Sequence, residues 1–206
     1  MTKTEIPDIV IGRLPLYLRA LQRMVQEGRQ VTSSQELGER LGISAAQIRK
    51  DLSQFGEFGK QGTGYSIEFL RDQLRQILKI DRVWEIAVVG AGDVGHALAR
   101  YQGFRDRGFE VVAIFDSDPK KIGKKINNFV IQDVANMKDK IQKMGIKVAM
   151  VATPASFAQD VVDQLVEAGV QAILNYAPIQ ISTPQNVRVQ FIDPATHLQR
   201  MSYYLE

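Results

Sequence analysis

Three glycines, spaced as Gly90-x-Gly92-x-x-Gly95, carry the most informative chemistry in the sequence. The apolar run Ile86–Val89 leads directly into them, and a helical stretch, His96–Tyr101, follows at once. In such a turn one glycine makes the bend, the next lets the backbone approach a pyrophosphate, and the third lets the helix pack on the strand. The N–H groups that begin the helix then face the phosphates. The pattern predicts a dinucleotide site; a glycine-rich turn without a ligand is the alternative.

Asp116 meets the second requirement of a dinucleotide site, an acidic residue that ends the next strand about 20 residues further on. Phe109–Phe115 has the composition of that strand. The carboxylate is expected to accept hydrogen bonds from a ribose hydroxyl and to repel a 2′-phosphate, which favours NAD(H) over NADP(H). Lys120 and Lys121 follow in a turn, and their cations keep a phosphorylated nucleotide or coenzyme A open as alternatives.

Further contacts with the cofactor are expected where other strands end. Val148–Ala152 and Ala172–Leu174 read as buried parallel strands, and ligands of doubly wound sheets lie beyond the carboxyl ends of such strands. We therefore expect cofactor contacts from Gly90, Ala91, Gly92, Asp93, Val94, Gly95, Tyr101, Asp116, Lys121, Thr153, Pro154, Asn175, Tyr176, Ala177 and Pro178.

Catalytic residues are not evident in the sequence. The 123 residues from Trp84 onward suffice for one Rossmann domain but leave none for a substrate domain. The two histidines, His96 and His197, lie without the arginine, lysine or carboxylate that hydride transfer to a carbonyl requires. We expect the nucleotide to be sensed rather than consumed. A small NAD-dependent oxidoreductase is the rival interpretation.

The first 80 residues have the pattern of a winged helix-turn-helix. Apolar residues recur at helical spacing between Asp8 and Gly28, and Pro15 within them predicts a kink or a late start of the helix. Ser33 and Ser44 each open a short helix with a capping box, and a glycine-containing turn joins the two helices. The glycine-rich stretch 55–65 then predicts a hairpin wing.

The second of these short helices, residues 44–53, has the features of a DNA-recognition helix. Its early positions are slim or carry an amide, and two cations follow, as contacts with base edges and phosphates require. A solvated face of a helical subdomain is the alternative. The expected DNA contacts are Arg13, Ser33, Ser34, Ser44, Ala46, Gln47, Arg49, Lys50, Ser53, Lys60 and Gly62.

Charge and composition agree with this division of the chain. Residues 1–80 carry 12 Lys and Arg against nine Asp and Glu, whereas residues 81–206 have no net charge. A positive excess in the first module is suited to an anionic polymer. The sequence has no cysteine, no apolar run near the roughly 18 residues of a membrane span, and no signal-peptide core. We expect a cytoplasmic protein that binds neither a metal nor a membrane.

The order of elements predicts an α/β protein with three parts. Residues 1–80 form a winged-helix DNA-binding domain, and strands that alternate with helices over 81–193 predict a Rossmann-type, doubly wound parallel sheet that binds NAD(H). Residues 194–206 form a C-terminal helix.

The chain resembles the Rex family of bacterial redox-sensing transcriptional repressors over essentially its whole length. The resemblance implies a homodimer that binds a pseudo-palindromic operator when NADH is scarce and releases it when NADH binds. It also implies that the C-terminal helix crosses to the partner subunit, burying Leu198, Met201, Tyr204 and Leu205. It is carried by Arg13–Tyr17, Ile48–Gly56, Gly62–Tyr65, Val89–Gly95, Phe115–Pro119 and Asn175–Pro178.

Three residues are candidates for the switch between the two states. The nicotinamide ring is a cation in NAD⁺ and neutral in NADH, so a sensor must alter the surroundings of this ring between two conformations. Tyr101 and Asp193 are placed to respond. The resemblance implies that Arg19 makes an inter-domain contact. Our hypothesis is that Arg19 pairs with Asp193 in the DNA-binding form and that this contact breaks when NADH moves Tyr101. A coenzyme A-responsive regulator remains the alternative, and the sequence does not reveal the operator or the regulated genes.

Overall fold

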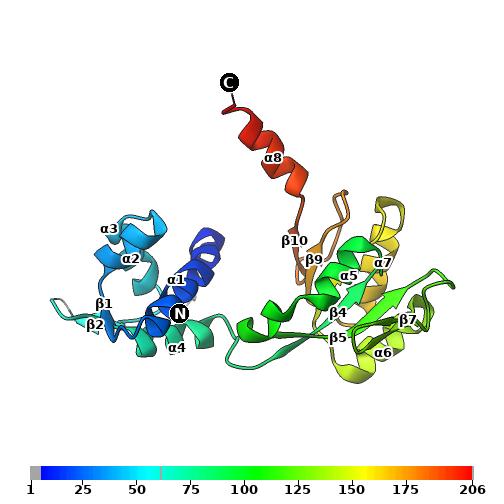
Figure 1. The fold of residues 1–206 in the computed structure, drawn as a ribbon, viewed down its shortest axis with the longest axis horizontal. Helices are drawn as coiled ribbons and strands as arrows, with labels where there is room; N and C mark the ends of the chain where they lie inside the picture. The colour runs from blue at the N-terminus through cyan, green and yellow to red at the C-terminus, as the bar shows by residue number, and fades with distance from the viewer. Residues whose placement is uncertain (1–5, 61, 206) are drawn as a thin grey trace. The chain divides into compact units, whose positions relative to one another are not determined.

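The computed structural model describes residues 6–60 and 62–205, and the chain divides into two compact units, Met1–Arg82 and Val83–Glu206. Each unit has its own apolar core. Figure 1 shows the elements of both units.

The first unit combines helices with a small antiparallel sheet. Among residues 6–60 and 62–82, three strands lie in the order β1-β3-β2. The arrangement is the winged helix-turn-helix that the sequence predicts: α2 and α3 form the helix pair, and β2 and β3 form the wing. The elements are α1 (Asp8–Gln26), β1 (Val31–Thr32), α2 (Ser34–Leu41), α3 (Ala45–Ser53), β2 (Gly59–Lys60), β3 (Gly64–Ser66) and α4 (Ile67–Ile77).

Helix α1 passes through Pro15 without a break. It begins at Asp8, so the expectation that Pro15 marks a late start is wrong. Pro15 lies on the exposed side of the helix, where solvent can reach the carbonyl group that has lost its N–H partner. The opposite side packs Leu14, Tyr17 and Leu21 into the core of the first unit.

Serine caps begin both helices of the helix-turn-helix. The Ser33 hydroxyl accepts a hydrogen bond from the Glu36 N–H at 3.1 Å, and the Ser44 hydroxyl accepts one from the Gln47 N–H at 3.2 Å. This satisfies one backbone donor at the start of each helix. The Glu36 and Gln47 side chains bind other partners instead of completing the predicted capping boxes.

The second unit is built on one twisted sheet. Among residues 83–205, seven strands lie in the order β10-β9-β8-β4-β5-β7-β6, and all neighbours are parallel except β6 and β7. The chain moves outward from β4 through β5 to β7 and then returns to β8 on the other side. This reversal places a ligand-binding crevice at the carboxyl ends of β4 and β8. The strands are β4 (Trp84–Val89), β5 (Phe109–Asp116), β6 (Lys125–Ile126), β7 (Phe129–Asp133), β8 (Val148–Val151), β9 (Ala172–Asn175) and β10 (Arg188–Phe191).

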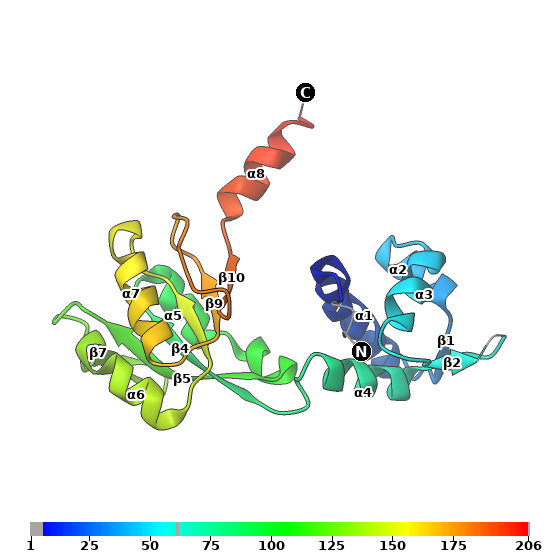
Figure 2. The same ribbon diagram turned by 180° about the vertical axis from the view of Figure 1, so that it is seen from behind.

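Helices cover both faces of this sheet (Figure 2). Helix α5 (Asp93–Arg100) packs Ala99 against Ile86 and Val88 of β4, whereas α6 (Met137–Met144) and α7 (Ala155–Glu167) share a core with the opposite face. The sheet with helices on both faces is the doubly wound α/β fold expected from the sequence. Two short 3₁₀ helices, Gln102–Arg107 and Val134–Asn136, join these elements.

The last helix, α8 (Pro194–Ser202), differs from the others because every one of its residues is exposed. Its apolar side chains include Leu198, 64% exposed, and Met201, 62% exposed. Most helical stability in proteins comes from packing of an apolar face. Within the described residues of the second unit, this helix therefore has no such packing.

Gly38 is the residue that lets α2 lie close to the turn before α3. A Cβ atom at this position would overlap the carbonyl oxygen of Ile43, whereas a Cβ atom at Gly12, on the exposed side of α1, would meet open space. We expect Gly38→Ala to lower the free energy of unfolding by about 1–3 kcal/mol through overpacking. Gly12→Ala should raise it by up to about 1 kcal/mol because alanine favours helix.

Chemical denaturation of the two variants and the unchanged protein measures both effects. Equal shifts for the two variants would show that close approach at Gly38 does not constrain the helix-turn-helix.

Candidate functional site

Two of the three motif glycines are required by close backbone contacts. Gly90 has φ of +100°, and a Cβ atom there would press on the Ala152 carbonyl at the end of β8. A Cβ atom at Gly95 would overlap the carbonyl oxygen of Gly90, so only glycine lets α5 pack on the loop. Gly92 is the N-cap of α5 and faces open space. The loop therefore has the geometry that the sequence motif predicts.

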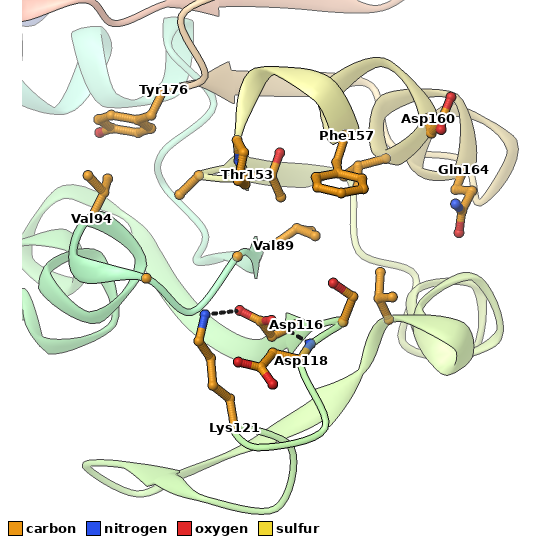
Figure 3. Close-up of a pocket in the computed structure, with 17 residues that line it drawn as sticks. Val89, Val94, Asp116, Asp118, Lys121, Thr153, Phe157, Asp160, Gln164 and Tyr176 are labelled. Carbon is orange, nitrogen blue, oxygen red and sulfur yellow. Dashed lines mark hydrogen bonds and ion pairs between the residues drawn. The ribbon is translucent and has the colours of Figure 1, made fainter.

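Asp116 ties this loop to the turn that follows β5, and Figure 3 shows its side chain beside Lys121 and Asp118 of that turn. One carboxylate oxygen accepts the Ala91 N–H at 2.7 Å and the Lys121 ammonium at 3.1 Å, and the other accepts the Asp118 N–H at 2.8 Å. Burial opposes ionisation of Asp116, but the hydrogen bonds from the two N–H groups and Lys121 outweigh it and lower the pKa of the carboxyl group. Asp116 is thus a fixed negative charge beside the glycine loop.

A cavity of about 570 Å³ opens at the carboxyl ends of β4, β5, β8 and β9. It lies where the reversal of strand order predicts a ligand. The hydroxyl oxygen of Thr153 is buried there and has no hydrogen-bond partner among the described residues, so it is available to a ligand. Of the residues expected to contact a cofactor, those that line the cavity are Gly90, Gly92, Val94, Asp116, Lys121, Thr153, Pro154 and Tyr176.

Other expected cofactor residues support the cavity from outside its lining. Ala91 donates its N–H to Asp116, and Gly95 holds α5 against the loop. Asn175 is completely buried, and its side-chain amide donates to the carbonyl oxygens of Ala177 and Ile179. It therefore shapes the loop after β9. Asp93 begins α5, and Ala177 and Pro178 line a separate hollow near Asp193.

The sequence motif does not identify the part of the cavity that α7 contributes. Phe157, Asp160, Val161 and Gln164 line it, and Phe157 lies over the cavity in Figure 3. Their spacing of three, four and seven residues places them on one helical face, which is the signal in the sequence that points to them. The remaining lining residues are Val89, Ser117, Asp118, Val134 and Ala152.

The side chain of Tyr101 lies outside this cavity. Its ring packs edge-to-face on Phe104, with ring centroids 4.9 Å apart, and the Arg107 guanidinium lies 5.9 Å from the ring centroid. It lines a second hollow beside the start of β5. A direct contact between Tyr101 and a nucleotide would therefore need this ring to move.

Asp193 has a structural task as the N-cap of α8. Its carboxylate accepts the Ala195 N–H at 2.9 Å and the Thr196 hydroxyl at 2.8 Å. Arg19 is exposed on α1. The pairing of Arg19 with Asp193 stays a prediction, because it joins the two units of the chain.

Most residues expected to bind DNA are exposed in the structure. Ser33, Ser44, Ala46, Arg49, Lys50 and Ser53 are exposed. The Arg49 guanidinium donates to the Ser34 hydroxyl at 2.9 Å, which links α3 to the start of α2. Gly62 lies exposed in the turn between β2 and β3, while the side chain of Lys60 is outside the described part of the chain.

Arg13 and Gln47 differ from the rest of the expected DNA contacts. Both are half-buried, and both donate to the carboxylate of Asp51, which lies on the inner side of α3. The structure therefore gives these two residues a partner within the protein.

Comparisons with known proteins match both units. A family described as "Putative DNA-binding protein N-terminus" matches residues 5–53, and one described as "CoA binding domain" matches residues 81–179. A redox-sensing transcriptional repressor Rex from Chloroflexus aurantiacus is 55% identical over 206 residues, which cover 100% of this chain and 97% of the relative. A Rex protein from Brevibacillus brevis is 42% identical over 206 residues and 100% of both chains.

The chain belongs to the Rex family.

A solved structure of RSP in complex with β-NAD⁺ and operator DNA matches with a TM-score of 0.94 and 38% identity, covering 98% of this chain and 93% of that one. RSP in complex with β-NADH matches with a TM-score of 0.89 and 36% identity, covering 98% and 95%. RSP is itself described as a Rex-family repressor. The Rex family membership thus extends from sequence to the whole fold.

Within residues 6–60 and 62–205, no helix of this Rex-family chain is long and apolar enough to cross a bilayer. The same residues bring together no group of three or more His, Cys, Asp or Glu side chains that could hold a metal ion.

In the glycine loop of this Rex-family chain, substitutions at Gly95 and Gly92 should affect stability and ligand binding differently. We expect Gly95→Ala to lower both the free energy of unfolding and NADH binding, because the new Cβ atom displaces α5. Gly92→Ala should leave the free energy of unfolding within about 0.5 kcal/mol. It should weaken NADH binding by about tenfold or more, because its Cβ atom enters the space needed by a pyrophosphate.

Denaturant unfolding and fluorescence titration with NADH measure the two properties separately. A Gly92→Ala variant that binds NADH normally would show that the pyrophosphate does not approach this backbone.

Proposed function

We propose that this chain is a transcriptional repressor that senses the NADH/NAD⁺ ratio, binds operator DNA and releases it when NADH binds. The observation that carries the proposal is the match of 98% of the chain to RSP in complex with β-NAD⁺ and operator DNA. Its relatives are named as transcriptional repressors, and this chain accordingly acts as a regulator rather than as an enzyme.

The charges around Asp116 support NAD(H) as the ligand. The ionised carboxylate disfavours a 2′-phosphate at the adenosine end of the cavity. Lys121, one of the two lysines that left NADP(H) open in the sequence, is paired with Asp116 at 3.1 Å. The charge of Lys121 is therefore already partly compensated within the protein.

Coenzyme A is the second candidate ligand, and the match of residues 81–179 to a "CoA binding domain" favours it. Thermal shift measurements with NADH, NAD⁺, NADPH and coenzyme A distinguish the candidates. Our proposal requires the largest shift with NADH.

Operator recognition is assigned to the exposed side of α3. Ala46, Arg49, Lys50 and Ser53 recur at helical spacing, with slim residues at the ends and two cations between them. Such a helix enters the major groove, while the starts of α2 and α3 and the wing hairpin contact the backbone. We place the protein in the cytoplasm, because a repressor acts where the chromosome lies.

A homodimer explains the exposed apolar side chains of α8. Leu198 and Met201 lie three residues apart on α8, Leu205 follows the helix, and none of the three is covered by the described residues of the second unit. We assign these three side chains to the surface of a second copy, with α8 exchanged between subunits. Two DNA-binding domains then read half-sites about one helical turn, or a multiple of it, apart.

The switch in this proposal connects three residues. NADH binding draws the Tyr101 ring away from Phe104 and alters the surroundings of Asp193, which otherwise pairs with Arg19 in the DNA-binding form. Because Asp193 also caps α8, any change at its carboxylate reaches the start of the exchanged helix.

The proposed function is tested by titrating operator DNA with the protein in the presence of NADH or NAD⁺. We expect NADH, and not the same concentration of NAD⁺, to weaken operator binding. Lys50→Ala should weaken operator binding by about tenfold to a hundredfold, because it removes a contact with DNA, and should leave NADH affinity unchanged. Lys143→Ala, on α6, is the control of equal charge.

Operator binding that ignores the pyridine nucleotide would overturn the sensing function. Loss of NADH binding together with operator binding in Lys50→Ala would mean that the residue maintains the fold.

The dimer is tested by placing charge on α8. We expect Leu198→Asp combined with Met201→Asp to convert the dimer to monomer, because a buried carboxylate at an apolar interface is costly. Gln199→Asp on the same helix is the control and should leave the dimer intact. Sedimentation velocity measures the oligomeric state, and a dimeric double variant would contradict the role of α8.

A further inference from the structure

Asp51 is a buried carboxylate at the centre of the first unit. It lies on α3 and is completely shielded from solvent. Four hydrogen bonds from described residues converge on it. The Arg13 guanidinium donates from Nε at 2.5 Å and from Nη2 at 2.8 Å, the Tyr17 hydroxyl donates at 2.6 Å, and the Gln47 amide donates at 2.7 Å.

The charges of this group balance each other. Burial opposes ionisation of Asp51, but the hydrogen bonds from Arg13, Tyr17 and Gln47 outweigh it and lower the pKa of the carboxyl group. Burial and the carboxylate of Asp51 raise the pKa of Tyr17, so its hydroxyl keeps the proton that it donates. The carboxylate therefore stays ionised and is paired with one arginine, as a buried charge requires.

The directions of these hydrogen bonds fix the rotation of α3. Ile48 and Leu52 of α3 are buried in the core, but apolar contacts have no direction and allow a helix to turn about its own axis. A bidentate arginine–carboxylate pair has a fixed planar geometry. Arg13 and Tyr17 both belong to α1, one turn apart, so they hold Asp51, and α3 with it, at one angle.

We infer that Asp51 positions the DNA-recognition face of α3, and that Arg13 and Gln47 act through Asp51 instead of reading DNA. The inference rests on the proposed function and adds to it. Arg49 and Lys50 precede Asp51 directly, so the angle at which Asp51 is held sets where these two cations point. The Arg13 side chain is only 20% exposed, and two of its three nitrogens are already used.

The experiment compares Arg13→Gln with the double variant Arg13→Gln/Asp51→Asn, using full-length protein. Arg13→Gln leaves an unpaired buried carboxylate under the recognition face. We expect it to weaken operator binding at least tenfold and to lower the ratio of operator affinity to scrambled-duplex affinity. Adding Asp51→Asn removes the unpaired charge and should restore most of that ratio. Arg23→Gln, at the other end of α1, is the control.

The salt dependence of binding separates positioning from direct contact. A residue that contacts a phosphate changes the slope of log affinity against log salt by about one, for any sequence. We expect Arg13→Lys to keep that slope and still lose operator preference, because lysine retains the positive charge but cannot make the bidentate pair with Asp51. An Arg13→Gln variant that loses one unit of slope on operator and scrambled duplex alike, and is not rescued by Asp51→Asn, overturns the inference.

Gln47→Ala provides a further test, and we expect this substitution to change the free energy of unfolding less than the substitutions at Arg13. If Gln47 only orients Asp51, the variant should lose discrimination moderately at several base pairs of the operator. Complete loss at one base pair, measured with single-base substitutions in the operator, would make Gln47 a base reader and contradict the inference. If the unchanged protein shows no preference for its operator, the proposed function fails as well. If the unchanged protein binds its operator specifically and only the tests of Arg13 and Gln47 fail, then only the role of Asp51 is contradicted.

Discussion

The nucleotide site depends on one hydrogen bond, from the Ala91 N–H to the Asp116 carboxylate at 2.7 Å. It joins the loop after β4 to the end of β5, two segments that meet only because their strands are parallel neighbours. The same carboxylate holds the Asp118 N–H and Lys121. One ionised side chain thus fixes both the backbone that would receive phosphates and the polar edge that would receive a ribose.

Each unit of the chain uses a shielded aspartate in this way. Asp116 organises two loops of the second unit, and Asp51 organises two helices of the first. In both places backbone or side-chain donors outweigh the cost of burial, so the carboxylate remains charged. Directed bonds to a buried charge define geometry more narrowly than apolar packing does. A sensor that must relate a ligand pocket to a DNA-reading surface needs a well-defined geometry both at the pocket and at that surface.

The sequence predicts those features of the structure that are determined by residues close together in the chain. The glycine loop, Asp116 and the serine caps belong to short motifs whose spacing reflects local backbone geometry. The inward orientation of Gln47 does not follow from spacing. It depends on Asp51, which is bound in turn by Arg13, 38 residues before Asp51 in the chain. The contribution of α7 to the cavity is likewise set by tertiary packing, and so is the position of the Tyr101 ring on Phe104.

The nine exposed residues of α8 have a consequence for the proposed dimer, because the cover of this helix would depend on protein concentration. Isolated helices shorter than about 12–15 residues are marginal in water, so in the proposed dimer the second copy would add the packing that stabilises this helix. Mass action then sets the fraction of chains with a covered C-terminus, and the midpoint of thermal unfolding rises with protein concentration. In the proposed dimer, the amount of repressor that a cell makes would therefore influence how much of it has a covered C-terminal helix.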